Sequence, residues 1–360
     1  MKVLLQNRFT LLQTGAGDRI HFFSLLNSLK NQGIDVSYSL SSHICLKEYD
    51  LVHLFNITQG DTYFQFKNAK KQKKPVVLTP IHIPKIYHNH SKKDKMKDLV
   101  KKNQILRPVF NFLKYPLSPH KRKSKNLEYD AELLERTKKE LIKEADLLLP
   151  GSESEAKKIT SLYGMNTNTL VIYPGIEDIF HQASPDLFTK KFGLKDFIIS
   201  VGNIIPLKNQ LNLIKALRDS NIPVVFIGGM GKNNQYNKLF KKDLSKNIIY
   251  LGKLNREMVA SAFASASVGI LISYSETTGR VNLEAGAAGA AVVCSDIPVN
   301  REYMKNYAYY CDPDSIKSIK NQVLKAFNKG PVNGTQQFIR ENYTLEKYAE
   351  KVISAYKRLF

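Results

Sequence analysis

The chain has 360 residues, which exceeds a usual single domain and leaves room for two domains with separate cores. Its 43% hydrophobic and 24% charged residues are ordinary for a globular protein, and its longest apolar runs, 268–272 and 287–294, are far shorter than the roughly 20 residues of a membrane-spanning helix. The 54 Lys and Arg against 32 Asp and Glu give a net charge of +22, which indicates an anionic partner such as nucleic acid, lipid headgroups or a phosphorylated substrate.

Short runs of β-branched residues alternate with longer amphipathic segments, which is the pattern of parallel α/β units. The first segment, MKVLLQNRFTLLQ, is interrupted by polar residues at 6–8, so it predicts a β-strand and not a signal peptide. In the first half we predict strands at 2–6, 34–38, 51–54, 76–79, 146–149 and 168–172, and helices at 17–31, 60–71, 129–144 and 153–163.

The same pattern starts again after 174–196, which contains Pro, Gly and turn residues and is interpreted as a linker. Strands are predicted at 197–201, 223–228, 247–251, 267–272 and 291–294, helices at 209–219, 255–264 and 281–288, and three tail helices at 314–328, 334–341 and 345–358. We therefore predict an α/β protein with two Rossmann-like, doubly wound domains that face a central cleft. Ligands of such sheets bind beyond the carboxyl ends of the strands.

The segment 271–296, LISYSETTGRVNLEAGAAGAAVVCSD, joins two buried strands through a polar loop and a helix of small residues. The helix start offers free backbone N–H groups and a positive dipole end, which favour an anion such as a diphosphate. Gly279 lets the backbone approach a ligand, and the carboxylates of Glu276 and Glu284 could accept bonds from a sugar and a ribose. On the pattern alone, Glu276 could equally be a solvated loop charge and Glu284 a complement to the helix dipole.

This segment resembles the E-x7-E signature of the retaining GT-B glycosyltransferases, family 4 in particular. The residues in register are Glu276, Gly279, Leu283, Glu284, Ala285, Ala287, Gly289, Val292 and Val293. Thr277 and Thr278 stand where the family usually has Gly-Phe, and Ala290 and Ala291 replace a small residue and Pro. The resemblance implies the GT-B fold, a nucleotide-diphosphate sugar as donor, and retention of the anomeric configuration.

A second match is FIISVGNIIPLKNQLNLIKAL, residues 197–217, which resembles the first strand and helix of the family's C-terminal domain. It implies that Lys208 binds phosphate, while Asn203 occupies the position of a partner arginine and cannot neutralise charge. We expect Arg280 to supply that charge. An exposed lysine at a helix start is the alternative for Lys208.

In the first half, residues 14–36 resemble the family's glycine-rich turn and first helix, so Gly15 and Gly17 are expected to approach acceptor or donor phosphate. His82 follows Thr79 at a strand end, where the family often has a histidine facing the donor sugar, although the T-x-x-H spacing is one residue longer than usual. A structural or surface histidine is the alternative for His82, and also for His53.

The resemblance implies three parts: an acceptor-binding domain at 1–176, a nucleotide-sugar-binding domain at 177–343, and a helix at 344–360 that packs back on the first domain. Catalytic roles fall on Glu276, Lys208 and His82. The expected donor-binding residues are Gly202, Asn203, Lys208, Thr278, Gly279, Arg280, Val281 and Glu284.

A basic insertion at 85–126 interrupts the match and carries thirteen Lys and Arg against two Asp, so half of the net charge lies there. Apolar and aromatic residues recur among its lysines, a pattern typical of membrane-surface binding. The alternatives are a solvated loop and nucleic-acid binding; no nucleic-acid motif accompanies the charge, so we expect no nucleic acid.

We therefore predict a hexosyltransferase that moves a sugar from a nucleotide-diphosphate donor to a glycan or lipid-linked acceptor, in bacterial surface polysaccharide synthesis. No cofactor is expected: the fold usually works without a metal, and Asp312 and Asp314 fit a structural loop and a helix cap. Cys45, Cys294 and Cys311 form neither a disulfide framework nor a zinc pattern, so a cytoplasmic protein is expected. The basic insertion adds the expectation of a peripheral position at the inner membrane face. The alternatives are a nucleotide-sugar 2-epimerase on the same fold and a non-catalytic scaffold.

Overall fold

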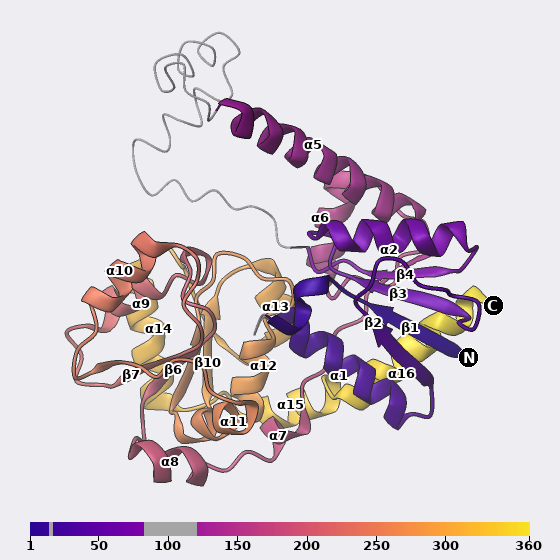
Figure 1. Cartoon of the computed structure of the whole chain (residues 1–360). Helices are drawn as coiled ribbons and strands as arrows, with labels where there is room; N and C mark the ends of the chain where they lie inside the picture. The colour runs from indigo at the N-terminus through magenta and orange to yellow at the C-terminus, as the bar shows by residue number, and fades with distance from the viewer. Residues whose placement is uncertain (14–16, 83–120) are drawn as a thin grey trace.

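The computed structural model describes residues 1–13, 17–82 and 121–360, with the backbone alone for 121–131. It consists of two α/β domains side by side, each a parallel sheet with helices on its faces, and the C-terminal helix returns to the domain that holds the N-terminus (Figure 1). The predicted fold class is thereby confirmed.

The first sheet has the strand order β2-β1-β3-β4-β5, and every pair in it is parallel. Its strands are β1 (Lys2–Gln6), β2 (Asp35–Ser39), β3 (Leu51–Phe55), β4 (Val76–Thr79) and β5 (Leu147–Leu148). The helices around it are α1 (Gly17–Asn31), α2 (Gly60–Lys71), α5 (Lys121–Glu144) and α6 (Glu153–Tyr163), and a short 3-10 helix, η1 (Phe9–Gln13), follows β1. β3 and β4 are buried throughout, as expected for a parallel sheet covered on both faces.

The second sheet has the order β11-β10-β9-β6-β7-β8 and is also parallel in every pair. Its strands are β6 (Ile198–Val201), β7 (Val224–Ile227), β8 (Ile248–Tyr250), β9 (Val268–Leu271), β10 (Ala291–Ser295) and β11 (Tyr309–Cys311). The helices of this half are α7 (Asp178–His181), α8 (Asp186–Phe192), α9 (Gln210–Leu217), α10 (Asn234–Lys242), α11 (Arg256–Ser265), α12 (Arg280–Ala287), α13 (Pro298–Met304), α14 (Ile316–Lys329) and α15 (Thr335–Asn342). A 3-10 turn, η2 (Pro206–Lys208), lies between β6 and α9.

The chain crosses between the two domains twice, and the two crossing segments lie against each other. Ile176 pairs with Thr344 in an isolated parallel bridge, and a Cβ on Gly175 would stand 2.3 Å from the Thr344 carbonyl oxygen. Directly after this point α16 (Leu345–Tyr356) packs on α1 and buries Tyr348 and Tyr356 in the core of the first domain. The domains are therefore joined by a narrow double connection.

The structure differs from the predicted elements in three places. Residues 168–172 form no strand, because Thr169 makes only a single bridge to Leu148. The segment interpreted as a linker contains α7 and α8, since Phe180 and Phe188 are fully buried in the second core and fold the chain around them. The additional elements α10, α13 and β11 complete the second domain. No helix in the described residues combines the length and apolar character needed to cross a membrane.

Candidate active site

The carboxyl edge of the second sheet is built from two glycine turns that touch. Gly202 follows β6 and Gly228 follows β7, and a Cβ on Gly228 would stand 2.0 Å from the Gly202 carbonyl oxygen. Only a glycine permits this approach of two backbones. The turns hold Asn203 and Gly229 at neighbouring points beyond the strand ends, where open α/β sheets bind their ligands.

Lys208 and Glu276 meet at this edge. The Lys208 Nζ lies 2.5 Å from the Glu276 Oε1, and their side chains are 19% and 10% exposed. Lys208 ends η2, its Cε lies 3.9 Å from the point where a Gly202 Cβ would stand, and Glu276 belongs to the loop between β9 and α12. The structure therefore brings together two of the three residues that the sequence predicts as catalytic.

The loop 273–279 leads into α12 through a left-handed residue. Gly279 has a φ of 55°, forms the N-cap of α12 and accepts a hydrogen bond from the Asn282 N–H. Its side-chain position is crowded, because a Cβ would lie 3.0 Å from the Asn300 Oδ1. The partly buried Val281 and the first N–H groups of α12 follow at once, so the helix presents its positive dipole end beside this loop.

Glu284, the second carboxylate of the signature, is buried and ion-paired. Its Oε1 accepts a hydrogen bond from the Arg256 Nη2 at 2.7 Å, and Arg256 also bonds Glu177 in the connection between the domains. Burial alone would lower the pKa of Arg256, but the two carboxylates raise it, so its guanidinium stays charged. This carboxylate of α12 is thus tied to the interdomain connection through Arg256.

The side chain of Arg280, which we expect to replace the charge that Asn203 lacks, lies at the junction with the first domain. Its Nη2 is 3.9 Å from the Glu177 Oε2, and its charge acts on His21 and Tyr348 of the first domain's core. Burial lowers the pKa of Arg280. The side chain of Arg280 thus lies at the junction with α16, and its role in neutralising a diphosphate stays a prediction.

Residues from the first domain hold the loop 273–279 in place. The Ser152 hydroxyl donates to the Thr277 carbonyl oxygen at 3.0 Å, and a Cβ on Gly151 would stand 2.7 Å from the Thr278 Cγ2. The two threonines that depart from the family pattern therefore form an interdomain contact, with the backbone of one and the methyl group of the other facing the start of α6.

The start of α6 also receives a carboxylate from the second domain. Glu302 of α13 accepts hydrogen bonds from the Glu153 N–H at 2.6 Å, the Ser154 N–H at 3.1 Å and the Ser154 hydroxyl at 2.9 Å. These N–H groups lie in the first helical turn, which has no intrahelical acceptors of its own. The second domain thus caps a helix of the first.

His82 lies near this contact, but its ring faces the first domain. The imidazole ring packs edge-on against the ring of Tyr163, with 5.6 Å between the two centroids. Burial is the main cause that lowers the pKa of His82 to about 4, and the positive charge of Lys138 is the second. Neither ring nitrogen has a hydrogen-bond partner among the described residues. The structure does not bring His82 to Lys208 and Glu276.

The buried Glu155 explains how the backbone at His82 is held. Its carboxylate accepts the His82 N–H at 2.6 Å and the Gly151 N–H at 2.8 Å, while the Glu155 N–H donates to the Ser152 hydroxyl. The Ser152 side of this arrangement is that of a capping box, for which S-x-x-E at 152–155 is the sequence signal, but the Glu155 carboxylate bonds Gly151, the residue before the N-cap, and His82 instead of the Ser152 N–H. Burial raises the pKa of Glu155 to about 7, although the two N–H groups that bond its carboxylate lower the pKa in part.

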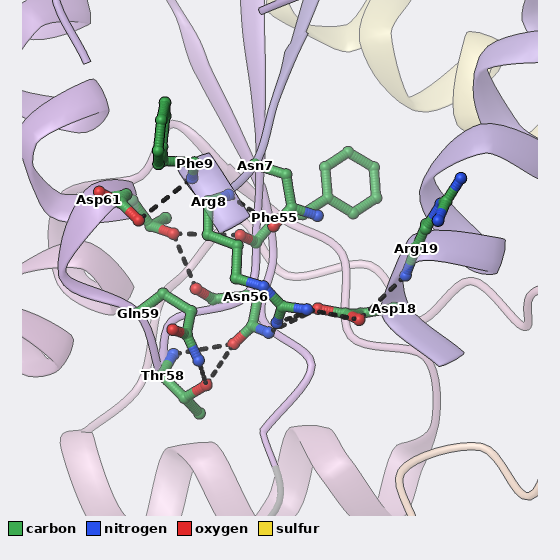
Figure 2. A network of polar contacts seen from close by, with 11 residues as sticks. Asn7, Arg8, Phe9, Asp18, Arg19, Phe55, Asn56, Thr58, Gln59 and Asp61 are labelled. Atoms are coloured by element: carbon green, nitrogen blue, oxygen red, sulfur yellow. Dashed lines mark hydrogen bonds and ion pairs between the residues drawn. The ribbon is translucent and has the colours of Figure 1, made fainter. Parts of the chain in front are cut away.

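A second polar cluster lies at the carboxyl ends of β1 and β3 in the first domain (Figure 2). Arg8 forms a two-point contact with Asp18 at 2.5 and 3.2 Å, and the Asn56 amide donates to the same carboxylate at 3.2 Å. Asp18 follows Gly17, the exposed first residue of α1, whereas Gly15 lies outside the described residues. The arrangement fixes the start of α1 at the strand ends.

Three remaining expectations concern residues away from this edge. His53 is fully buried between Tyr356 and Thr79, which agrees with a structural histidine. In the described part of the chain no cluster of His, Cys, Asp and Glu is arranged to hold a metal ion. The insertion 85–126 lies outside the described residues up to 120, and only the backbone of its last six residues is described.

Comparison with known proteins finds a family model that matches the second half of the chain. Residues 188–358 match the family model of glycosyl transferases group 1. Over 170 residues the chain is 29% identical to a D-inositol 3-phosphate glycosyltransferase of Mycolicibacterium smegmatis, which covers 44% of this chain and 39% of that protein. It is 26% identical over 218 residues to a processive diacylglycerol alpha-glucosyltransferase of Acholeplasma laidlawii, covering 58% of each chain. The chain thus spans less than two thirds of the length of these curated relatives.

Solved structures match over almost the whole chain. A sucrose-phosphate synthase from Thermosynechococcus elongatus aligns with a TM-score of 0.74 and 14% identity over 100% of this chain and 99% of that one. Anabaena HepE in complex with UDP-glucose aligns with a TM-score of 0.70 and 14% identity over 99% of this chain and 100% of that one. At such identities the likeness concerns the fold, which is the GT-B arrangement.

Proposed function

Because the chain carries a group 1 glycosyl transferase domain over residues 188–358 within a GT-B fold, we propose that it is a glycosyltransferase that uses a nucleotide-diphosphate sugar. The observation that carries the proposal is the pairing of Lys208 with Glu276 beside two glycine turns and the start of α12. A cation, free backbone N–H groups and a carboxylate meet there, which suits a diphosphate attached to a sugar. The complex of Anabaena HepE with UDP-glucose supports this class of donor.

When the donor binds, Lys208 exchanges its present partner, Glu276, for the diphosphate. In the structure its ammonium is neutralised by Glu276, and a diphosphate at the helix start would compete for it with a larger negative charge. Glu276 would then be released to accept hydrogen bonds from sugar hydroxyls. As the bond from sugar to phosphate breaks, negative charge grows on the leaving diphosphate, and Lys208 and the N–H groups of α12 stabilise it.

Glu284 is assigned to the ribose hydroxyls, because a buried carboxylate held by a permanently charged arginine keeps acceptor capacity on its remaining lone pairs. Its link through Arg256 to Glu177 connects the donor side with the interdomain connection. The reaction is proposed to need no metal, with the charge of the leaving group met by side-chain cations and backbone N–H groups.

For the acceptor we propose a glycan or lipid-linked molecule at the first domain, with a hexose as the transferred sugar and retention of configuration, as the E-x7-E resemblance implies. The names of the relatives that act on inositol phosphate and diacylglycerol are compatible with phosphorylated or lipid acceptors. The basic insertion 85–126 would place the enzyme on an anionic membrane surface. Surface polysaccharide synthesis is the proposed setting.

The test is incubation of the purified protein with UDP-, GDP-, ADP- and dTDP-sugars, with and without a panel of lipid-linked and free glycan acceptors. Release of nucleoside diphosphate that depends on an acceptor is the expected result, and Lys208→Ala should reduce it strongly. An altered nucleotide sugar formed without acceptor would indicate an epimerase. No consumption of any donor, together with no nucleotide binding, would indicate a scaffold and contradict the proposal.

A further inference from the structure

We propose that Lys253, which follows β8, is a further ligand of the donor diphosphate and supplies the positive charge that Asn203 lacks. The inference rests on the proposed function, since it concerns the same donor site. It is separate from the expectation for Arg280, whose side chain lies at the junction with the first domain.

Lys253 and Asn203 lie over the same glycine. At the position where a Cβ of Gly229 would stand, the Lys253 Cε is 2.5 Å away, the Lys253 Nζ is 3.5 Å away and the Asn203 Oδ1 is 3.2 Å away. Gly229 is buried although it lies beyond the end of β7, because the lysine stem covers it. The ammonium group therefore stands beside the amide that occupies the arginine position.

Backbone pairing holds residues 203 and 253 close to each other. β8 pairs with β7 and β7 with β6, so the residues beyond the three strand ends come together in a row. The Gly228 N–H donates to the Gly252 carbonyl oxygen at 2.8 Å, and the Ile204 N–H donates to the Gly229 carbonyl oxygen at 2.8 Å. Residue 253 is thus placed next to residue 203 by two hydrogen bonds that do not involve either side chain.

The charges at this edge explain why a second cation is needed. Lys208 is paired with Glu276, so the pair carries no net charge before a donor arrives. Asn203 can donate a hydrogen bond to a phosphate oxygen but cannot neutralise it. Lys253 is exposed and has no ion-pair partner among the described residues. With Lys208 on one side of the glycine turns and Lys253 on the other, a diphosphate would meet two ammonium groups.

The experiment measures dissociation constants by calorimetry for the wild type and for Lys253→Gln. The probes are the nucleoside diphosphate among UDP, GDP, ADP and dTDP that the wild type binds most tightly, and the corresponding nucleoside without phosphate. We expect Lys253→Gln to weaken the diphosphate about tenfold, as befits one charge-assisted contact, and to leave the nucleoside unchanged. Lys246→Gln is the matched control, because it removes the same charge from an exposed lysine just before β8, at the opposite end of that strand.

A rescue variant makes the test independent of general damage. Asn203→Arg in the Lys253→Gln background restores the family's arginine and should recover most of the lost affinity. The inference is overturned if Lys253→Gln binds the diphosphate like the wild type, if Lys246→Gln loses as much, or if the nucleoside weakens equally, which would make Lys253 a base contact. A wild type that binds no nucleoside diphosphate would overturn the proposed function and this inference with it.

Discussion

Replacing Glu302 by alanine removes the carboxylate with which the second domain caps helix α6 of the first. Three donors of α6 lose their acceptor, namely the N–H groups of Glu153 and Ser154 and the Ser154 hydroxyl, and the Tyr173 hydroxyl loses its interaction with the same carboxylate. A hydrogen bond to a charged group contributes about 1.5–3 kcal/mol when water is excluded, but Glu302 is half-buried and water can replace part of the loss. We therefore expect the free energy of unfolding to fall by about 2 kcal/mol, including the interaction with the helix dipole.

The matched control is Glu153→Ala, which removes a carboxylate from the first turn of the same helix without breaking a bond between the domains. It should change the free energy of unfolding by no more than about 0.5 kcal/mol, as exposed surface changes do. Urea unfolding followed by tyrosine fluorescence and circular dichroism suits a chain with 18 tyrosines and no tryptophan. Equal losses in Glu302→Ala and Glu153→Ala would refute the interdomain cap.

Three further predictions concern packing and pH. Gly279→Ala should cost about 1–2 kcal/mol of stability and weaken nucleotide binding in a calorimetric titration, because the residue has a φ of 55° at the start of α12. Gly269→Ala should cost about 1–3 kcal/mol in urea unfolding, since its Cβ would lie 2.5 Å from the Cβ of Ala285; an unchanged midpoint would contradict the tight strand–helix contact. The pKa of Glu155 is raised from 4.5 to about 7 by burial, so its contribution to stability is complete below pH 4.5 and is lost as the pH rises through 7. The wild type should therefore lose about 3 kcal/mol relative to Glu155→Gln between these pH values, and parallel pH profiles of the two proteins would refute the shift.

The sequence predicts most of this architecture because the buried strands are short β-branched runs with clear ends. It misses β11 and α13, whose residues carry no distinct periodicity and depend on packing against β10 and α6. It also misreads the segment 174–196, where single buried phenylalanines, and not a regular pattern, hold α7 and α8 in the core. Whether such short elements form depends on which of their side chains are buried by the rest of the fold.

The residues of the candidate site also divide into those that sequence motifs reveal and those that only the fold brings together. Glu276, Gly279 and Lys208 could be found because they fall within contiguous motifs. The place of Arg280 depends on the direction in which one helix points its side chains, and the place of Lys253 depends on the strand order β6-β7-β8. Asn203 and Lys253 are distant in sequence, so only the folded sheet makes them neighbours.

Transfer of a sugar from a nucleotide-diphosphate sugar can be measured as the mass of the acceptor after reaction. Acceptor incubated with the protein and the donor that it consumes should gain the mass of a sugar residue, with an equal amount of nucleoside diphosphate released. Unmodified acceptor beside free sugar, or beside an altered nucleotide sugar, would contradict transfer of the sugar to the acceptor.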